Sequence, residues 1–279
     1  ADRLDEGRRT REGRTALRAD AAPPLACRHM DVDLIAIAQR ALTLLDLTEL
    51  GTGATEADVV RLCERAITPF GHVAAVCVWP RHVALAAREL MSAPVQIATV
   101  VNFPSGDDSV AHVVDATEAA LRDGANEIDL VLPYHAYLGG AIEHVALMLD
   151  AVHAVTTANR ALLKVILETG ELRDPDHVAA AARLAIAHGA DFVKTSTGTT
   201  PVSATLEATG ILLRVIVGAD RPVGLKASGG IRTVEQAGEY LDQAERIMGP
   251  SWARPTTFRF GASALLDALL ATLDGHPNP

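Results

Sequence analysis

The stretch ADFVKTSTG (190–198) decides the fold, because it places a lysine inside a short β-rich run. Side chains alternate between the two faces of a strand, so Val193 lies on one face and Lys194 on the other. The next such run, PVGLKAS (222–228), repeats this arrangement around Lys226. Two successive strands therefore present an apolar face and a face that carries a lysine.

Two earlier runs carry charges in the same way. In EIDLVLP (127–133) the alternation separates Asp129 from the apolar positions, and in LLKVILE (162–168) it separates Lys164. A barrel strand directs its apolar set towards surrounding helices. We therefore expect four consecutive strands to direct charged side chains into one interior.

Strands alternate with helical stretches along the chain. Apolar residues at i, i+3 and i+4 predict helices over 109–124, 174–189 and 233–249, each ending at a glycine. Eight runs are predicted as strands: LTLLDLT (42–48), VAAVCVW (73–79), QIATVVNF (96–103), EIDLVLP, LLKVILE, DFVKTST (191–197), PVGLKAS and TFRFGAS (257–263). This pattern predicts an α/β protein with a single (β/α)8 TIM barrel. A doubly wound open sheet is the alternative, but it usually has fewer strands and a glycine-rich first turn, and no GxGxxG sequence is present.

Composition and charge narrow the class of protein. The chain has 279 residues, of which 49% are apolar, so it can bury a large core. A net charge of −10 argues against a nucleic-acid partner. Three cysteines without a CxxC pair favour a reducing, cytoplasmic location. No apolar run reaches the roughly 18 residues of a membrane span.

The first 29 residues differ in character from the rest. They are rich in arginine and charged runs, and they contain Pro23 and Pro24 but no apolar segment typical of a signal peptide. We expect a disordered N-terminal extension over 1–29 and the barrel domain over 30–279. A functional arm that contacts another subunit is the alternative for the extension.

Interior lysines have two explanations. They can belong to an ion-pair network that holds the barrel together, or they can supply a nucleophile. Lys194 and Lys226 are on neighbouring strands, about 4.8 Å apart, and a nearby cation together with desolvation lowers the pKa of a lysine enough for it to attack a carbonyl. A nearby Asp129 would move protons. This is Schiff-base chemistry, which needs no metal and no cofactor.

The loops that follow two of the predicted strands suggest an anion site. Loops after the seventh and eighth strands of a barrel commonly bind phosphate through backbone N–H groups. The residues that follow these strands are Gly229, Gly230, Ile231, Arg232, Gly261 and Ser263. Ordinary turn geometry is the alternative reason for these glycines. The ten histidines show no HxH or HExxH spacing, so no metal site is expected.

Seven blocks in order resemble one known family. The strand around Lys194 resembles the Schiff-base strand of the deoxyribose-phosphate aldolases, and NEIDLVLPY with Asp129 resembles their acid/base strand. The other blocks are AAVCVWPRHV, ATVVNFPSG, LLKVILETGEL, VGLKASGGIRT and FRFGASALL, and the similarity runs from about Leu44 to Leu270. The resemblance implies a (β/α)8 barrel that reversibly joins acetaldehyde to glyceraldehyde 3-phosphate.

The resemblance also implies roles for individual residues. Lys194 would form the imine, Lys226 would lower the pKa of Lys194, and Asp129 would assist the proton steps. Lys164 matches a charged interior position, either catalytic or tuning the local electrostatics. The substrate-binding positions implied in addition to the phosphate loops are Asp46, Thr48, Cys77, Thr197 and Gly198, with Cys77 either a reactive thiol or a buried apolar residue. By the same analogy the partners are small aldehydes and sugar phosphates, and the assembly is a homodimer.

Two positions depart from the family pattern. Thr199 stands where many bacterial members have lysine, and Ala264 stands where serine is frequent. We therefore expect weaker discrimination between phosphorylated and non-phosphorylated substrates. Three other functions stay open: a lysine-dependent barrel enzyme that takes a ketone donor, a catalytically silent barrel that binds phosphate, and an isomerase that uses a carboxylate base.

Overall fold

Eight parallel strands close into a barrel in this computed structural model, which describes residues 25–275. Around the barrel the strand order is β1-β10-β9-β8-β7-β6-β5-β4, with every neighbouring pair parallel. The strands are β1 (Leu45–Glu49), β4 (Ala75–Val78), β5 (Gln96–Val101), β6 (Glu127–Val131), β7 (Leu162–Ile166), β8 (Phe192–Lys194), β9 (Gly224–Ser228) and β10 (Phe258–Ala262). The predicted (β/α)8 barrel is confirmed, and a closed sheet excludes the doubly wound alternative.

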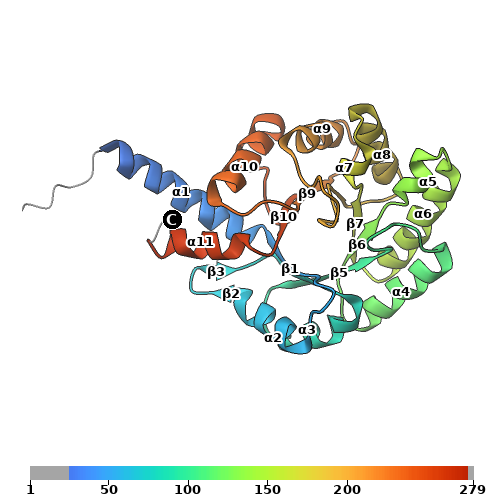
Figure 1. Ribbon diagram of the computed structural model, residues 1–279, viewed down its shortest axis with the longest axis horizontal. Helices are drawn as coiled ribbons and strands as arrows, with labels where there is room; N and C mark the ends of the chain where they lie inside the picture. The colour runs from blue at the N-terminus through green and yellow to red at the C-terminus, as the bar shows by residue number, and fades with distance from the viewer. Residues whose placement is uncertain (1–24, 276–279) are drawn as a thin grey trace, which may run out of the picture.

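Helices surround the barrel on its outer side (Figure 1). They are α1 (Leu25–Thr43), α2 (Glu56–Arg65), α3 (Val83–Glu89), α4 (Val110–Arg122), α5 (Tyr134–Leu138), α6 (Ile142–Ala158), α7 (Thr169–Leu172), α8 (Pro175–Ala187), α9 (Leu206–Val217), α10 (Val234–Met248) and α11 (Leu265–Leu273), with a 3-10 turn η1 (Pro80–His82) before α3. The three helices predicted from periodicity are α4, α8 and α10. Their first turns are capped by Ser109, Asp174 and Thr233, whose side chains accept from backbone N–H groups that the helix leaves free.

A short hairpin is among the elements that the sequence did not predict. A short antiparallel hairpin, β2 (Ile67–Thr68) and β3 (Gly71–His72), follows α2. Each strand has two residues, which is too short for an alternation pattern to show. Gly71 has φ +125°, a conformation open to glycine, and Thr68 closes the turn by donating to the Gly71 carbonyl.

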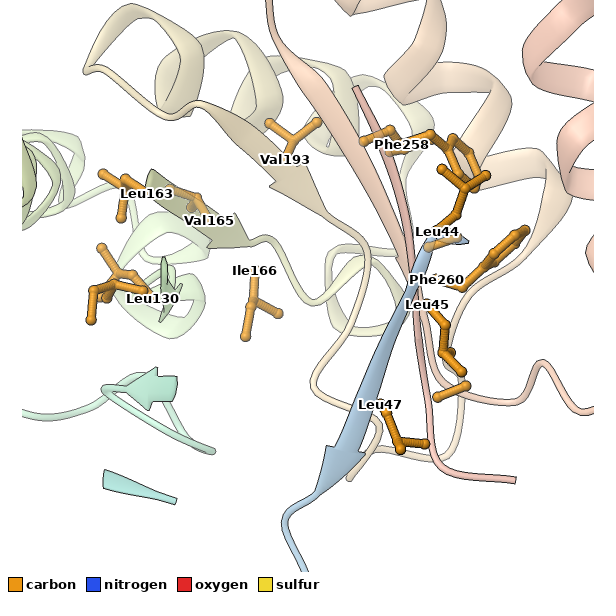
Figure 2. Packing of buried hydrophobic residues seen from close by; sticks show 14 of the residues in the cluster. Leu44, Leu45, Leu47, Leu130, Leu163, Val165, Ile166, Val193, Phe258 and Phe260 are labelled. Carbon is orange, nitrogen blue, oxygen red and sulfur yellow. The ribbon is translucent and has the colours of Figure 1, made fainter. Parts of the chain in front are cut away.

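The main core lies between the barrel and its helices. Leu45 and Leu47 on β1, together with Phe258 and Phe260 on β10, are fully or almost fully buried in this layer (Figure 2). The residues between them in sequence point to the opposite face of each strand. The apolar pattern of the strands therefore fixes their outer faces and leaves the inner faces for other residue types.

The inner faces divide the barrel interior into two parts. On β4 and β5 the interior holds a small apolar cluster of Cys77, Ala98 and Val100. The remaining six strands contribute the buried charged side chains, which are described below. The charged half of the interior is therefore built by β1 and by β6 to β10.

The first helix covers one side of the barrel. Helix α1 packs against α10 and α11 and begins at Leu25, ahead of the predicted domain start at Met30. The predicted extension lies mostly outside the described residues, and it stays a prediction. Within residues 25–275, no helix is both long and apolar enough to cross a membrane.

Candidate active site

Asp129 stands at the centre of the buried charged cluster. Its Oδ1 accepts from Lys164 at 2.7 Å, and its Oδ2 accepts from Lys194 at 2.8 Å and from Lys226 at 2.7 Å. The four side chains come from the consecutive strands β6, β7, β8 and β9, as the alternation predicted. All four are at most 2% exposed. The structure thus brings together the four residues predicted to be catalytic.

Two further carboxylates and an arginine extend this cluster. Asp46 on β1 lies 2.6 Å from Lys226 through Oδ2 and accepts from Arg259 at 2.5 Å through Oδ1. Glu127 on β6 lies 2.7 Å from Lys164 and accepts from Arg259 at 2.8 Å. The cluster is therefore continuous from Arg259 to the central carboxylate.

The three lysines differ in how many carboxylates hold them. Within the described residues, Lys194 contacts Asp129 alone, whereas Lys226 contacts Asp129 and Asp46. Lys164 lies within 4 Å of three carboxylates. Because each carboxylate contact favours the ammonium form, Lys194 is the lysine that gives up its proton most easily.

The pKa shifts follow this difference. Burial lowers the pKa of Lys194, and the nearby Lys226 lowers it further, so it lies below its ordinary value of 10.5 although Asp129 opposes the shift. Burial also lowers the pKa of Lys226, but Asp129 and Asp46 outweigh it and the pKa is raised. For Lys164, Asp129 and Glu127 likewise outweigh burial and raise the pKa. Lys194 is thus the one lysine of the cluster whose pKa is lowered, and the other two hold their protons more firmly than a free lysine does.

The central carboxylates stay ionised. Burial on its own raises the pKa of Asp129, yet the three surrounding lysines hold it well below its ordinary value of 3.8. Burial raises the pKa of Asp46 in the same way, but Lys226 and Arg259 keep it lowered. The neighbouring cations therefore favour the ionised form of both carboxylates.

These lysines are also the protein's entire lysine content. Among 25 lysine and arginine residues, the sequence contains three lysines, and they are Lys164, Lys194 and Lys226. All other basic side chains of this kind are arginines. Arginine stays charged and is not a nucleophile at neutral pH. Primary amine side chains are thus confined to the barrel interior.

A cavity of about 350 Å³ opens above the cluster, at the carboxyl ends of β1, β8, β9 and β10. Nine of the predicted substrate-binding residues line it: Thr48, Thr197, Gly198, Gly229, Gly230, Ile231, Arg232, Gly261 and Ser263. Thr199 and Ala264, the two departures from the family pattern, line it as well. The predicted phosphate loops therefore share one space with Thr48, Thr197 and Gly198.

Glycine is required at different positions of this cavity for different structural reasons. A Cβ on Gly261 would lie 2.3 Å from Ser228 Oγ and 3.0 Å from Lys226 Cε, so β10 can approach β9 only without a side chain. Gly230 has φ +84° with open space around it. Its N–H and that of Ile231 have no hydrogen-bond acceptor within the described residues, whereas Gly229 N–H donates to the Gly261 carbonyl at 3.2 Å.

Two predicted substrate-binding residues do not line the cavity. Asp46 is fully buried and serves as a carboxylate of the ion-paired cluster. Cys77 is also fully buried, among Ala98 and Val100, and burial raises the pKa of its thiol. A thiol in this position packs as a small apolar side chain, the second of the two explanations given for it.

Three buried charged residues were absent from the predicted site. Glu127 and Arg259 form the lower part of the cluster. Glu168, which follows β7, is fully buried and accepts from Thr197 through the backbone N–H at 3.2 Å and the hydroxyl at 2.5 Å. It also accepts from the Thr200 hydroxyl at 3.2 Å. Glu168 therefore fixes the loop after β8 that lines the cavity.

The described residues offer no set of metal ligands. Among residues 25–275, no three His, Cys, Asp or Glu side chains are grouped so that they could hold an ion. The carboxylates of the cluster are already occupied by lysine and arginine nitrogens.

A closed (β/α)8 barrel in which one of three buried lysines has a lowered pKa defines a class of protein suited to carbonyl chemistry. Residues 40–271 match the family model described as DeoC/LacD family aldolase. The chain therefore belongs to the DeoC/LacD family of aldolases, which confirms the prediction of an aldolase. A curated relative, the deoxyribose-phosphate aldolase of Agrobacterium fabrum (strain C58), is 54% identical over 235 residues, which cover 84% of this chain and 90% of the relative.

Solved structures agree with this assignment. The apo form of a Toxoplasma gondii ME49 protein assigned to the deoxyribose-phosphate aldolases has a TM-score of 0.80 and 26% identity, covering 88% of this chain and 98% of its own. The deoxyribose phosphate aldolase of Aeropyrum pernix, described as a tetramer, has a TM-score of 0.71 over 89% of this chain and 98% of its own. At 23% identity, that second likeness concerns the fold alone.

Proposed function

We propose that this protein is a class I aldolase that reversibly cleaves 2-deoxy-D-ribose 5-phosphate to acetaldehyde and D-glyceraldehyde 3-phosphate through an imine on Lys194. One observation carries the proposal. Of three buried lysines, Lys194 alone has a lowered pKa and a single carboxylate contact, so it is the amine able to attack a carbonyl. The name of the Agrobacterium relative supports the substrate.

The proposed reaction starts at the aldehyde carbon of the open-chain sugar. The neutral Lys194 amine adds to this carbon, and loss of water leaves the protonated imine. Asp129 lies within hydrogen-bonding distance of both Lys194 and Lys226, so it connects the two side chains, which supports a proton path for the loss of water. Asp129 first orients the amine, because its low pKa makes it a weak base in the free enzyme.

Carbon–carbon cleavage follows from the imine. Removal of the proton from the C3 hydroxyl lets the C2–C3 bond break, and its electron pair enters the imine to form an enamine. Glyceraldehyde 3-phosphate leaves with the new aldehyde group. Protonation of the enamine carbon and hydrolysis of the imine then release acetaldehyde and return the Lys194 amine.

The cavity suits the phosphate end of such a substrate. Gly230 and Ile231 line the cavity, and their N–H groups have no acceptor among residues 25–275, in a loop where glycine allows close backbone approach. Arg232 is the basic side chain among its lining residues, and Glu49 is an acidic one. With Thr199 in place of a lysine, the lining carries little net positive charge, which supports modest discrimination for phosphate.

Borohydride trapping tests the proposal. The protein is incubated with 2-deoxyribose 5-phosphate and sodium borohydride, and peptides are then mapped by mass. We expect a reduced adduct on Lys194 and none in a Lys194→Met variant whose circular dichroism shows that it is folded. Assignment is direct because the chain contains only two other lysines.

Other arms of the same experiment separate the competing functions. Trapping with dihydroxyacetone phosphate but not with acetaldehyde would replace the proposed donor by a ketone. No adduct from any carbonyl compound, with folded protein, would contradict an imine mechanism and favour a silent barrel.

A further inference from the structure

The charged cluster extends far below the amine that the proposed reaction uses. Lys194 ends β8, whereas Glu127 begins β6 and Arg259 is the second residue of β10. Glu127 and Arg259 line a separate cavity of about 570 Å³ at the amino ends of the strands. They lie at the end of the barrel opposite the substrate opening, and neither lines the upper cavity.

Direct contacts nevertheless connect this lower pair to the amine. Arg259 donates to Asp46 Oδ1, and the other oxygen of Asp46 lies 2.6 Å from Lys226. Glu127 lies 2.7 Å from Lys164. Both lysines share Asp129 with Lys194, so two paths of ion pairs lead from the lower pair to the nucleophile.

The buried cluster contains more basic groups than carboxylates. The ion-paired cluster contains four basic groups, namely the three lysines and Arg259, and three carboxylates, namely Asp46, Glu127 and Asp129. With every group ionised, the cluster has one positive charge in excess. Burial makes a net charge costly. Loss of one proton balances the cluster, and Lys194 has the fewest carboxylate contacts.

We propose that Arg259 and Glu127 are positioning residues for the aldol reaction, which set the charge state of the Lys194 amine from the opposite end of the barrel through Asp46 and Lys164. The inference rests on the proposed function, because it gives the neutral amine a task. Arg259 supplies the fourth positive charge of a cluster that has three carboxylates, so it favours loss of the proton from Lys194. Glu127 limits this effect by balancing part of the positive charge.

Other groups also face Lys194 and stay constant in the test. They are Asp129 from β6, Lys226 from β9 and Cys77 from β4, while Lys164 from β7 contacts the other oxygen of Asp129. Glu168 is a further buried carboxylate, which bonds to threonine groups and makes no ion pair within 4 Å among the described residues. A shift after substitution at Arg259 or Glu127 therefore reports the lower pair.

The lysine content allows the charge state to be measured without substrate. Protein labelled with 13C at lysine Cε gives three resonances, and their pH titration by NMR follows each amine separately. Single Lys→Met variants assign the three resonances. An Arg259→Met variant should raise the pKa of Lys194, because a cation that opposes its protonation is gone. A Glu127→Gln variant should lower it, because an anion that favours protonation is gone.

Each shift should be about one pH unit, since two strand spacings place the charges about 10 Å apart in a medium of effective dielectric constant near 20. The double variant Arg259→Met/Glu127→Gln loses one cation and one anion, so the net charge of the cluster is unchanged. The titration midpoint of Lys194 should therefore return to that of the unmodified protein. Arg259→Lys keeps the charge and should also stay near it. Arg65→Met removes an exposed cation paired with Asp267 and serves as the matched control.

Opposite shifts in the two single variants, cancelled in the double variant, would support the inference. Unchanged midpoints, or shifts of the same sign, would overturn it. Should Arg259→Met fail to fold, Glu127→Gln alone decides, because the amide keeps the shape of the carboxylate. Since NMR reads the amine without catalysis, absence of a borohydride adduct would refute the proposed function and leave this result standing.

Discussion

Two buried glutamates, one at each end of the barrel, illustrate opposite uses of the same side chain. Glu127 begins β6 at the lower end and pairs with Lys164 and Arg259. Glu168 follows β7 at the upper end, and its partners among residues 25–275 are uncharged groups of Thr197 and Thr200. Its backbone also adopts φ +54°, which is unusual for a residue with a side chain.

The difference separates charge balance from loop geometry. At the lower end, cations and carboxylates satisfy one another and close the interior. At the upper end, the Glu168 carboxylate holds the loop that lines the cavity, and its own backbone is strained. Buried charge is tolerated in both places because every oxygen has partners. Lys194 lies between the two regions, where the contacts become fewer.

Substitution of the residue that joins the two regions should have the largest effect. In Asp129→Asn, one amide replaces the carboxylate that accepts from three lysine side chains. We expect kcat/KM for deoxyribose-phosphate cleavage to fall about 10³-fold, as loss of a proton-transfer group does. The free energy of unfolding should fall by about 3–5 kcal/mol, because buried cations lose their partner.

Urea unfolding and steady-state kinetics measure the two effects of Asp129→Asn. Asp58→Asn, at the exposed capping box of α2, is the control for loss of a carboxylate. Retained activity would show that Asp129 is a structural charge of the lower type and has no part in the chemistry.

Substitution of the upper glutamate should act on binding. In Glu168→Gln, the side chain keeps its size but has one acceptor oxygen for the three donors of Thr197 and Thr200. We expect KM to rise about tenfold, equivalent to about 1.4 kcal/mol, while kcat changes less. Glu171→Gln, in the same segment, is the matched control and should leave both constants unchanged.

A fall in kcat without a change in KM would place Glu168 in the chemistry and remove the contrast with Glu127. Kinetics with deoxyribose 5-phosphate at saturating and limiting concentrations distinguish the two results.

The smallest effect is expected at the rim of the cavity. A Thr199→Lys/Ala264→Ser variant replaces the Thr199 hydroxyl by an ammonium group and adds a hydroxyl at position 264, where the chain has none. The ratio of kcat/KM for 2-deoxyribose 5-phosphate to that for 2-deoxyribose should rise roughly five- to tenfold, since a charge-assisted hydrogen bond to phosphate contributes about 1 kcal/mol or more at an exposed site. An unchanged ratio would refute the argument from Thr199 and Ala264.

The sequence predicted the barrel well because strand alternation is a local signal. All eight strands were located, and the lysines were correctly directed inward from residues such as Val193 and Leu225. The cavity residues after β9 and β10 were found because parallel strands bring their carboxyl ends to one edge. The hairpin at 67–72 was missed, since two-residue strands have no pattern to read.

The lower pair was missed for a different reason. Arg259 alternates with Phe258 and Phe260, so its inward direction was visible in the sequence. Its partner Glu127 is on β6, which is not a neighbour of β10 in the barrel. A contact across the interior depends on the closure and stagger of the strands, which no single segment encodes. Glu168 likewise depends on a left-handed residue that propensity does not predict.

Because every lysine lies inside the barrel, chemical labelling of lysine can report unfolding of the barrel. A bulky amine-reactive dye finds no lysine side chain on the folded surface, because the most accessible of the three is 2% exposed. Once the strands separate, three sites appear at the same time. Dye incorporated at lysine would therefore count the molecules that have opened, and a population stored, heated or attached to a support could be judged by colour.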